Sequence, residues 1–141
     1  MSLLGKVRFD HVSISVQDLD AQQRWYQDVL GFAQVIEQFE LPTPPVRTVV
    51  LEDQAGLRVE LIARAGSDRA EVYTDPLDAA RGQGYAHWAL QVEDLETAYR
   101  TLAQAGAKEV WPPADAVQPG ARFAYIADPE GNLIELIQPA A

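Results

Sequence analysis

The chain of 141 residues contains no cysteine. This absence excludes disulfides, thiolate nucleophiles, cysteine-ligated zinc and iron–sulfur clusters together. Any metal ion that the protein binds must therefore take nitrogen and oxygen ligands. Histidine is also scarce, because the chain has only two.

Long apolar runs are missing as well, although 48% of the residues are hydrophobic. Charged residues interrupt every apolar stretch before it reaches the length needed to span a membrane. The first residues, MSLLGKVRF, lack the apolar core and the cleavage site of a signal peptide. We therefore expect a cytoplasmic protein, with enough residues for one compact domain or two half-size modules that share a core.

Positive charge is in short supply, since 11 Lys and Arg residues stand against 21 Asp and Glu residues, for a formal net charge of -10. Such a chain repels a phosphate backbone, and no Lys/Arg stripe or basic helix offsets the repulsion. Nucleic acid is therefore not an expected partner. The ordinary role of this acidity is solubility.

The chain repeats itself. HVSISVQDL, which begins at His11, aligns with HWALQVEDL, which begins at His87. DQAGLRVELI, from Asp53, aligns with DPEGNLIELI, from Asp128, and both close on Glu-Leu-Ile. The spacing of the two matches differs by one residue, which is a single insertion or deletion. Because a repeat decides the architecture, we treat each half as one structural module.

Each half is predicted to form a strand, a helix and three further strands. Alternating hydrophobicity indicates the strands, whereas helical spacing, an opening Asp and a closing Gly indicate the helices. The expected elements are strands at 7–16, 33–40, 46–52 and 57–64 with a helix at 18–31, then strands at 84–92, 107–111, 121–127 and 133–138 with a helix at 94–106. The predicted fold is α+β, a single domain over residues 1–141 with module 1 at about 7–64 and module 2 at about 85–138. The polar stretch at about 65–84 is a linker or a functional loop.

Alternation along these strands places four polar residues opposite bulky apolar neighbours, and these four are His11, Glu60, His87 and Glu135. A lone strand His is usually hydrogen-bonded and a lone strand Glu usually solvated. Here both histidines, and two glutamates, fall at equivalent positions of the repeat. Because burying two unpaired carboxylates costs several kcal/mol per ion, a divalent cation is the simplest counter-charge.

The four residues are therefore predicted to bind one divalent metal ion. Two imidazoles and two carboxylates suit a borderline to hard ion, namely Ni, Zn, Co, Mn or Fe(II). An open position on such an ion polarises a bound oxygen, and a carboxylate beside it can remove a proton next to a carbonyl.

The paired βαβββ modules, the segment WYQDVLGF, the ending DPEGNLIELIQ and the spacing of the four residues resemble the vicinal oxygen chelate superfamily. This superfamily includes glyoxalase I, methylmalonyl-CoA epimerase, extradiol dioxygenases, fosfomycin-resistance transferases and metal-free bleomycin-binding proteins. The resemblance spans about residues 7–139. It implies curved mixed sheets that form a metal-binding cup, with helices on the outer face, and homodimers whose sites are sometimes shared between chains.

Glu60 is the residue that separates these functions. His11, His87 and Glu135 alone would satisfy the triad of the dioxygenases and transferases, whereas Glu60 as a fourth ligand matches the glyoxalase I arrangement, in which a metal-bound Glu acts as the base. The resemblance further implies that epimerases lack the DPEGN turn and tend to carry Gln at the position of Glu60. The leading prediction is a glyoxalase I-like lyase or isomerase that uses Glu135 and Glu60 on a small substrate with adjacent oxygens, through an enediolate-type intermediate. The alternatives are an Fe(II) extradiol-type dioxygenase and a non-catalytic protein that binds a bleomycin-like drug.

Two sets of side chains are candidates for binding the substrate. The basic candidates, each of which has an ordinary role at the surface, are Arg24, Arg64, Arg69, Arg81 and Arg122. The aromatic candidates for an apolar pocket are Tyr73, Trp88, Trp111, Phe123 and Tyr125. Alternation places Trp88 under the helices instead. The native metal, the identity of the base and the sharing of the site within or between chains stay open at this point.

Overall fold

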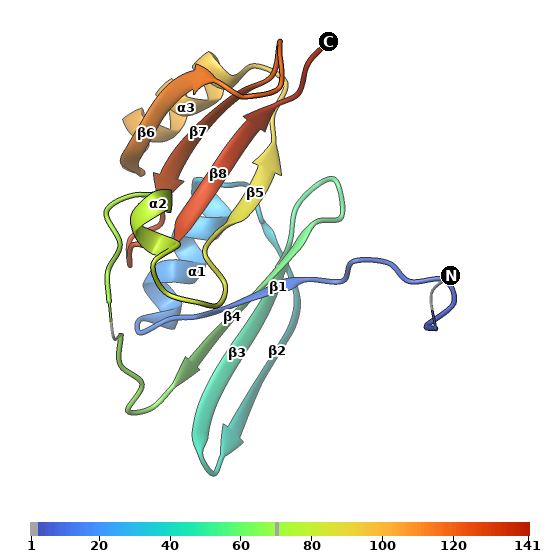
Figure 1. Ribbon diagram of the computed structural model, residues 1–141. Coiled ribbons are helices and arrows are strands. Elements are labelled where there is room, and N and C mark those ends of the chain that lie inside the picture. The colour runs from blue at the N-terminus through green and yellow to red at the C-terminus, as the bar shows by residue number, and fades with distance from the viewer. Residues whose placement is uncertain (1–2, 70) are drawn as a thin grey trace. The chain divides into compact units, whose positions relative to one another are not determined.

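The computed structural model describes residues 3–69 and 71–141, which fall into two compact units, Met1–Ser67 and Asp68–Ala141. Each unit holds one four-stranded sheet and one long helix (Figure 1). The boundary lies just beyond the end of the predicted first module. The grouping of both modules into a single domain stays a prediction.

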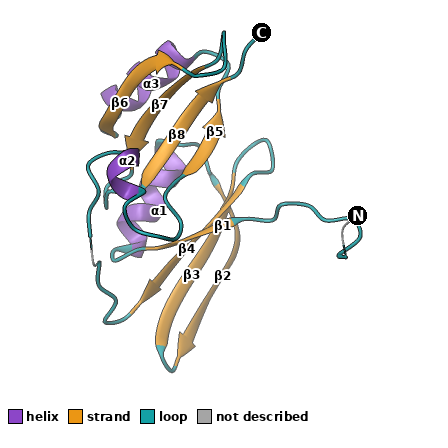
Figure 2. Ribbon diagram, in the orientation of Figure 1, coloured by secondary structure: helices purple, strands orange, loops and turns teal. Residues whose placement is uncertain are grey.

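The first unit contains β1 (Val12–Ser15), α1 (Leu19–Asp28), β2 (Gln34–Pro42), β3 (Pro45–Glu52) and β4 (Arg58–Arg64). The second contains α2 (Pro76–Ala79), β5 (Trp88–Gln91), α3 (Leu95–Gln104), β6 (Lys108–Asp115), β7 (Arg122–Ala127) and β8 (Leu133–Gln138) (Figure 2). The strand orders are β1-β4-β3-β2 and β5-β8-β7-β6. In each sheet the first pair is parallel and the other pairs are antiparallel. The predicted α+β fold of two βαβββ modules is confirmed.

The two long helices begin at their predicted Asp caps and end at Asp28 and Gln104, three and two residues before the predicted ends at Gly31 and Gly106. Asp18 accepts a hydrogen bond from the backbone N–H of Ala21, and Asp94 accepts one from the N–H of Thr97. These bonds satisfy amide groups that lack a partner in the first turn of a helix. Past the helix ends, Gly31 and Gly106 have φ values of 81° and 94°, a conformation that favours glycine.

One face of each sheet is closed by its helix. In the first unit α1 contacts β3 and β4, and the helix-facing sheet residues are at most 1% exposed: Val49, Leu51, Val59 and Leu61. In the second unit α3 contacts β6, β7 and β8, and the matching residues are Ala124, Ile126, Ile134 and Leu136. Side chains alternate along a strand, so Glu60 and Glu135 lie on the opposite face of their sheets.

Three predicted strand boundaries differ from the structure by four or more residues. β1 and β5 begin at Val12 and Trp88, so His11 and His87 lie immediately before the strands and not inside them. β6 continues to Asp115 with two register shifts, and the second of these, between Trp111 and Ala114, accommodates the two consecutive prolines.

The polar stretch at 65–84 is not wholly a loop, because it contains the short helix α2. Asp75 caps this helix by accepting a hydrogen bond from the N–H of Asp78, and Pro76 occupies its first turn. An Asp followed by Pro is a helix-start signal, and it was available in the sequence. Residue 70 of this stretch lies outside the described residues. In the part of the chain that the structure describes, no helix is both long and apolar enough to cross a membrane.

The cap of α3 makes folding stability depend on pH. The Thr97 hydroxyl donates to Asp94, and this bond, with the Thr97 N–H bond, lowers the pKa of Asp94 below its usual 3.8. A lowered carboxyl pKa adds stability that is present above the unfolded value and is lost as pH falls through the folded value. We expect Asp94→Ala to destabilise the protein at pH 6, with the gap to wild type narrowing below about pH 4. Urea unfolding across this range measures the gap, and Thr97→Val should reduce its pH-dependent part. A gap that stays constant down to about pH 2.5 would contradict the assignment.

Candidate metal-binding site

The first His–Glu pair arises from parallel pairing of β1 and β4. Ser13 pairs with Glu60 in the register, and His11 lies two residues earlier on the same face. The Nε2 atom of His11 is 3.9 Å from Oε1 of Glu60, and their side chains are 34% and 19% exposed. The pair is therefore partly shielded and still reachable from solvent.

Two neighbours hold this first pair in position. The Ser13 hydroxyl donates to Oε1 of Glu60 at 2.7 Å. Oδ2 of Asp10 lies 2.6 Å from Nδ1 of His11, and this hydrogen bond lowers the pKa of Asp10 below its usual 3.8. An ionised carboxylate can only accept, so Nδ1 is the donor in this bond, and Nε2 is the ring nitrogen on the side of Glu60. Neither Asp10 nor Ser13 was singled out from the sequence, although both lie beside His11 in it.

The second His–Glu pair repeats the geometry on β5 and β8. Ala89 pairs with Glu135 in the register, and His87 precedes Ala89 by two residues. Nε2 of His87 is 3.0 Å from Oε2 of Glu135, and these side chains are 27% and 19% exposed. The Tyr125 hydroxyl lies 3.4 Å from the same nitrogen. Burial raises the pKa of Tyr125 to about 12, and the charge of Glu135 acts in the same direction, so the phenol is neutral at physiological pH.

The donor set fits a divalent metal ion. Bonds of about 2.0–2.2 Å to imidazole and carboxylate place neighbouring ligand atoms about 3.0–3.5 Å apart. The 3.0 Å separation of the second pair falls within this range. The 3.9 Å separation of the first pair is slightly longer, and a small side-chain movement would bring it within the range. Over residues 3–69 and 71–141 the structure shows no cluster of three or more His, Asp or Glu side chains suited to a metal. Each unit thus offers two side chains that could bind a metal ion, one His and one Glu. That all four bind the same ion stays a prediction.

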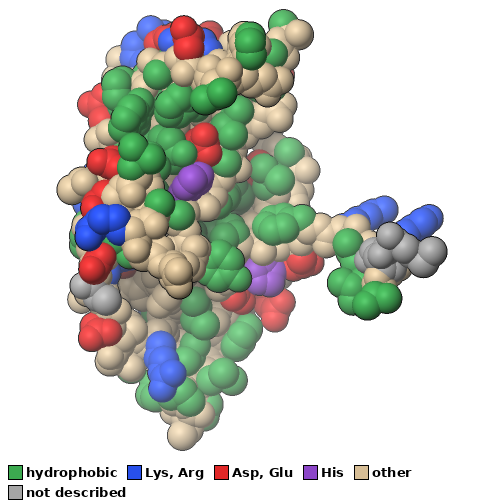
Figure 3. All heavy atoms as spheres, in the orientation of Figure 1, with side chains coloured by type: hydrophobic (Ala, Val, Ile, Leu, Met, Phe, Trp, Pro, Cys, Tyr) green, Lys and Arg blue, Asp and Glu red, His purple; other side chains and the backbone are tan. Residues whose placement is uncertain are grey.

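Both imidazoles reach the surface, and acidic side chains lie beside each (Figure 3). The predicted basic residues are not among these contacts. Arg69 donates to Asn132, Arg81 pairs with Asp78, and Arg122 pairs with Glu96 and Asp115. Arg24 and Arg64 are exposed. Arg69, Arg81 and Arg122 are therefore engaged in contacts within the second unit and not at a His–Glu pair.

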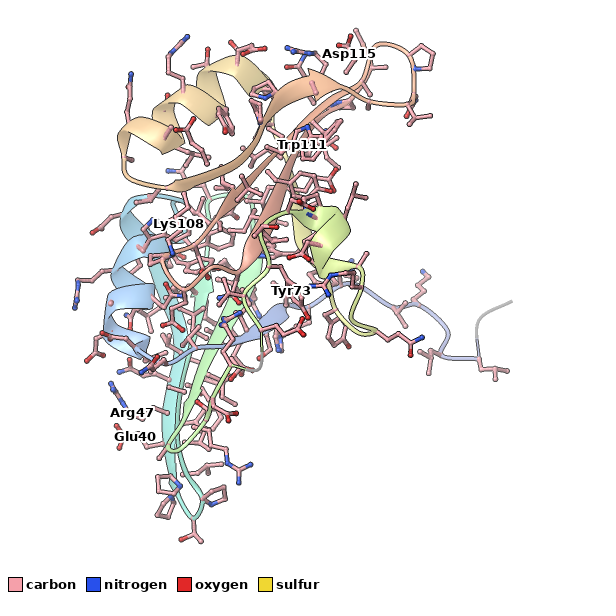
Figure 4. All side chains as sticks on the ribbon, turned by 60° about the vertical axis from the view of Figure 1, so that its left-hand side comes forward. Glu40, Arg47, Tyr73, Lys108, Trp111 and Asp115 are labelled. Atoms are coloured by element: carbon pink, nitrogen blue, oxygen red, sulfur yellow. The ribbon has the colours of Figure 1, made fainter. Side chains whose placement is uncertain are left out.

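Three of the five aromatic candidates lie together, and the other two lie apart from them. The strand registers place Trp111, Phe123 and Tyr125 on the Glu135 face of the second sheet. Trp88 pairs with Ile134, which is 0% exposed, so it lies on the helix-covered face as predicted. Tyr73 packs against the buried cluster of Ala79, Ala127 and Leu133, away from Trp111 on β6 (Figure 4).

Known proteins are similar to this chain in sequence and in fold. A family model for the Glyoxalase/Bleomycin resistance protein/Dioxygenase superfamily matches residues 8–136. The mitochondrial methylmalonyl-CoA epimerase of Mus musculus is 32% identical over 136 residues, which cover 93% of this chain and 72% of that protein. A lactoylglutathione lyase of Haemophilus influenzae is 28% identical over 132 residues, covering 91% of this chain and 90% of that protein.

The fold is also that of a solved structure. The crystal structure of the glyoxalase family protein from Enterococcus faecalis matches with a TM-score of 0.77 at 21% identity, covering 93% of this chain and 97% of that one. The chain therefore belongs to the Glyoxalase/Bleomycin resistance protein/Dioxygenase superfamily, the vicinal oxygen chelate superfamily that its motifs resemble.

Proposed function

We propose that the protein is a divalent-metal-dependent lyase or isomerase of the glyoxalase I type, acting on a small substrate with adjacent oxygens. The observation that supports this most directly is the repeated His–Glu pair, in which each His immediately precedes a strand that pairs in parallel with the strand of its Glu. The superfamily includes lyases and epimerases, so an enzyme is the natural expectation. The family and the two pairs together favour proton transfer next to a carbonyl.

In this proposal His11, Glu60, His87 and Glu135 hold one Ni, Zn, Co, Mn or Fe(II) ion. When bound, the ion supplies Lewis acidity, which polarises a substrate oxygen. Asp10 accepts a hydrogen bond from Nδ1 of His11, so Nε2 is the ring nitrogen that is left to bind the metal ion. The units that supply the two pairs belong to one chain or to the two chains of a homodimer, as the family resemblance suggests.

The two glutamates have different surroundings, which suits a division of labour. Ser13 donates a hydrogen bond to Glu60, which holds that carboxylate in place. The residue equivalent to Ser13 in the second unit is Ala89, so Glu135 receives no bond from a serine there. Glu135 or Glu60 removes the proton next to the substrate carbonyl and returns it to the neighbouring carbon, and substitution separates the two roles.

The epimerase relative supports a second candidate. An epimerase for a methylmalonyl-CoA-like thioester also needs a base that removes a proton next to a carbonyl, and that relative is 32% identical. Glu60 and the DPEGN turn favour the lyase instead. In this turn Asp128 is 0% exposed and accepts hydrogen bonds from the backbone of Glu130 and Asn132. Assays with both substrate classes decide between the candidates.

The metal site predicts a stoichiometry. Protein purified without chelator or affinity nickel should contain about one equivalent of a divalent metal per site, and Glu60→Ala should weaken binding at least about tenfold because it removes a ligand. Glu40→Ala is the matched control, since Glu40 lies in the same sheet and pairs with Arg47. Elemental analysis and metal titration measure both. Ferrous iron bound equally well without Glu60 would favour the dioxygenase, and no specific metal would favour the drug-binding protein.

The proposed base predicts a loss of turnover. Glu135→Gln keeps the shape of the side chain but removes its charge, so turnover of 2-oxoaldehyde thiol adducts should fall by about 10²–10⁴-fold and metal binding should weaken. Circular dichroism checks that the fold survives. Methylmalonyl-CoA is tested in parallel by proton exchange at the carbon next to the thioester. Normal turnover by Glu135→Gln would exclude this residue from the mechanism.

A further inference from the structure

We propose that Trp111, Phe123 and Tyr125 form an aromatic wall that binds an aryl group of the substrate, next to the adjacent oxygens held at the metal site. The inference rests on the proposed function for the position of those oxygens. It goes beyond that function in naming the substrate class, which is an aryl-substituted compound with adjacent oxygens.

The aromatic wall begins directly at the second His–Glu pair. Tyr125 pairs with Glu135 across β7 and β8, and Trp111 pairs with Tyr125 across β6 and β7. The rings of His87 and Tyr125 meet edge to face with centroids 5.1 Å apart. Tyr125 and Phe123 follow at 6.0 Å, and Phe123 and Trp111 at 6.4 Å. The row of rings therefore extends without interruption from the proposed ligand His87 to Trp111 on β6.

The first unit provides an internal control, because it builds the same sheet without rings at the three equivalent positions. The ring of Phe39 on that sheet lies at the position equivalent to Ala114, outside these three. Val50 pairs with Glu60 as Tyr125 pairs with Glu135, and the other equivalent pairings identify the matching positions as Val50, Thr48 and Glu37. A βαβββ module therefore folds with an aliphatic, a small polar and an acidic residue at these three positions. The aromatic residues of the second unit are not required by the fold, so a role in binding explains them better.

The chemistry of the aromatic wall selects an aryl group over an anionic one. Trp111 and Phe123 are only partly buried, so their rings keep surface available for a ligand. Their register neighbours on this face include Ala89, Ala114 and Ile137, which are apolar. The aromatic wall itself contains no Lys or Arg to meet a carboxylate. Aromatic rings prefer other rings in edge-to-face or offset stacking, an attraction beyond that of apolar area alone.

The test uses two chelating probes that carry adjacent oxygens and need no turnover, benzohydroxamate and acetohydroxamate. Calorimetry on the metal-loaded protein gives their two dissociation constants. Wild type should bind benzohydroxamate at least about tenfold more tightly. Phe123→Thr, which installs the residue found at the equivalent position of the first unit, and Trp111→Ala should each reduce this ratio to about threefold or less.

The matched control is Leu77→Thr, which removes an apolar side chain that is 73% exposed on α2 of the same unit and lies outside the aromatic wall. Its binding ratio should equal that of wild type, and thermal unfolding verifies that every variant is folded. A ratio that both folded wall variants retain, or equal binding of the two probes to wild type, would overturn the proposal. A change of oligomeric state in Trp111→Ala with an unchanged ratio would overturn it too, and would assign these rings to a subunit contact. If neither probe binds the metal-loaded protein, the metal site of the proposed function fails, and the aromatic wall loses its role with it.

Discussion

The parallel pairing of the first and last strands of each module is the constraint on which the rest of the site depends. It aligns Ser13 with Glu60 and Ala89 with Glu135, and it thereby brings His11 and His87 to the same faces as these glutamates. A shift of one residue would turn a glutamate into the helix-covered core. The apolar neighbours of Glu60 and Glu135, which are almost fully buried against the helices, oppose such a shift. The hydrophobic core thus sets the register, and the register sets the chemistry.

The duplicated architecture then allows two similar pairs to acquire different surroundings. The first pair is held by Asp10 and Ser13, whereas the second lies beside the neutral phenol of Tyr125. These neighbours come from positions that are equivalent in the two modules but carry different residues. The repeat therefore separates what the fold requires, which both modules keep, from what a particular reaction and substrate require.

Much of this organisation could be predicted from the sequence. The repeat and the alternation of apolar residues identified every strand and both long helices, because each of these elements has one buried face. The helix α2 was missed because four residues are too few to show a periodicity. The starts of β1 and β5 were placed too early, because the alternation of the sequence begins several residues before the first residue that pairs with the neighbouring strand. The rings of Phe123 and Trp111 were visible as candidates, but their contact depends on register shifts in β6 that only the paired strands define.

The central claim is that one His from each module binds the same metal ion. X-ray absorption spectroscopy of protein loaded with one equivalent of zinc tests it directly, because the scattering pattern of imidazole rings counts histidine ligands. We expect two imidazoles per zinc in wild type, with oxygen filling the other positions, and one imidazole in both His11→Ala and His87→Ala. A first shell with a single imidazole in wild type, or one unchanged by either substitution, would contradict it.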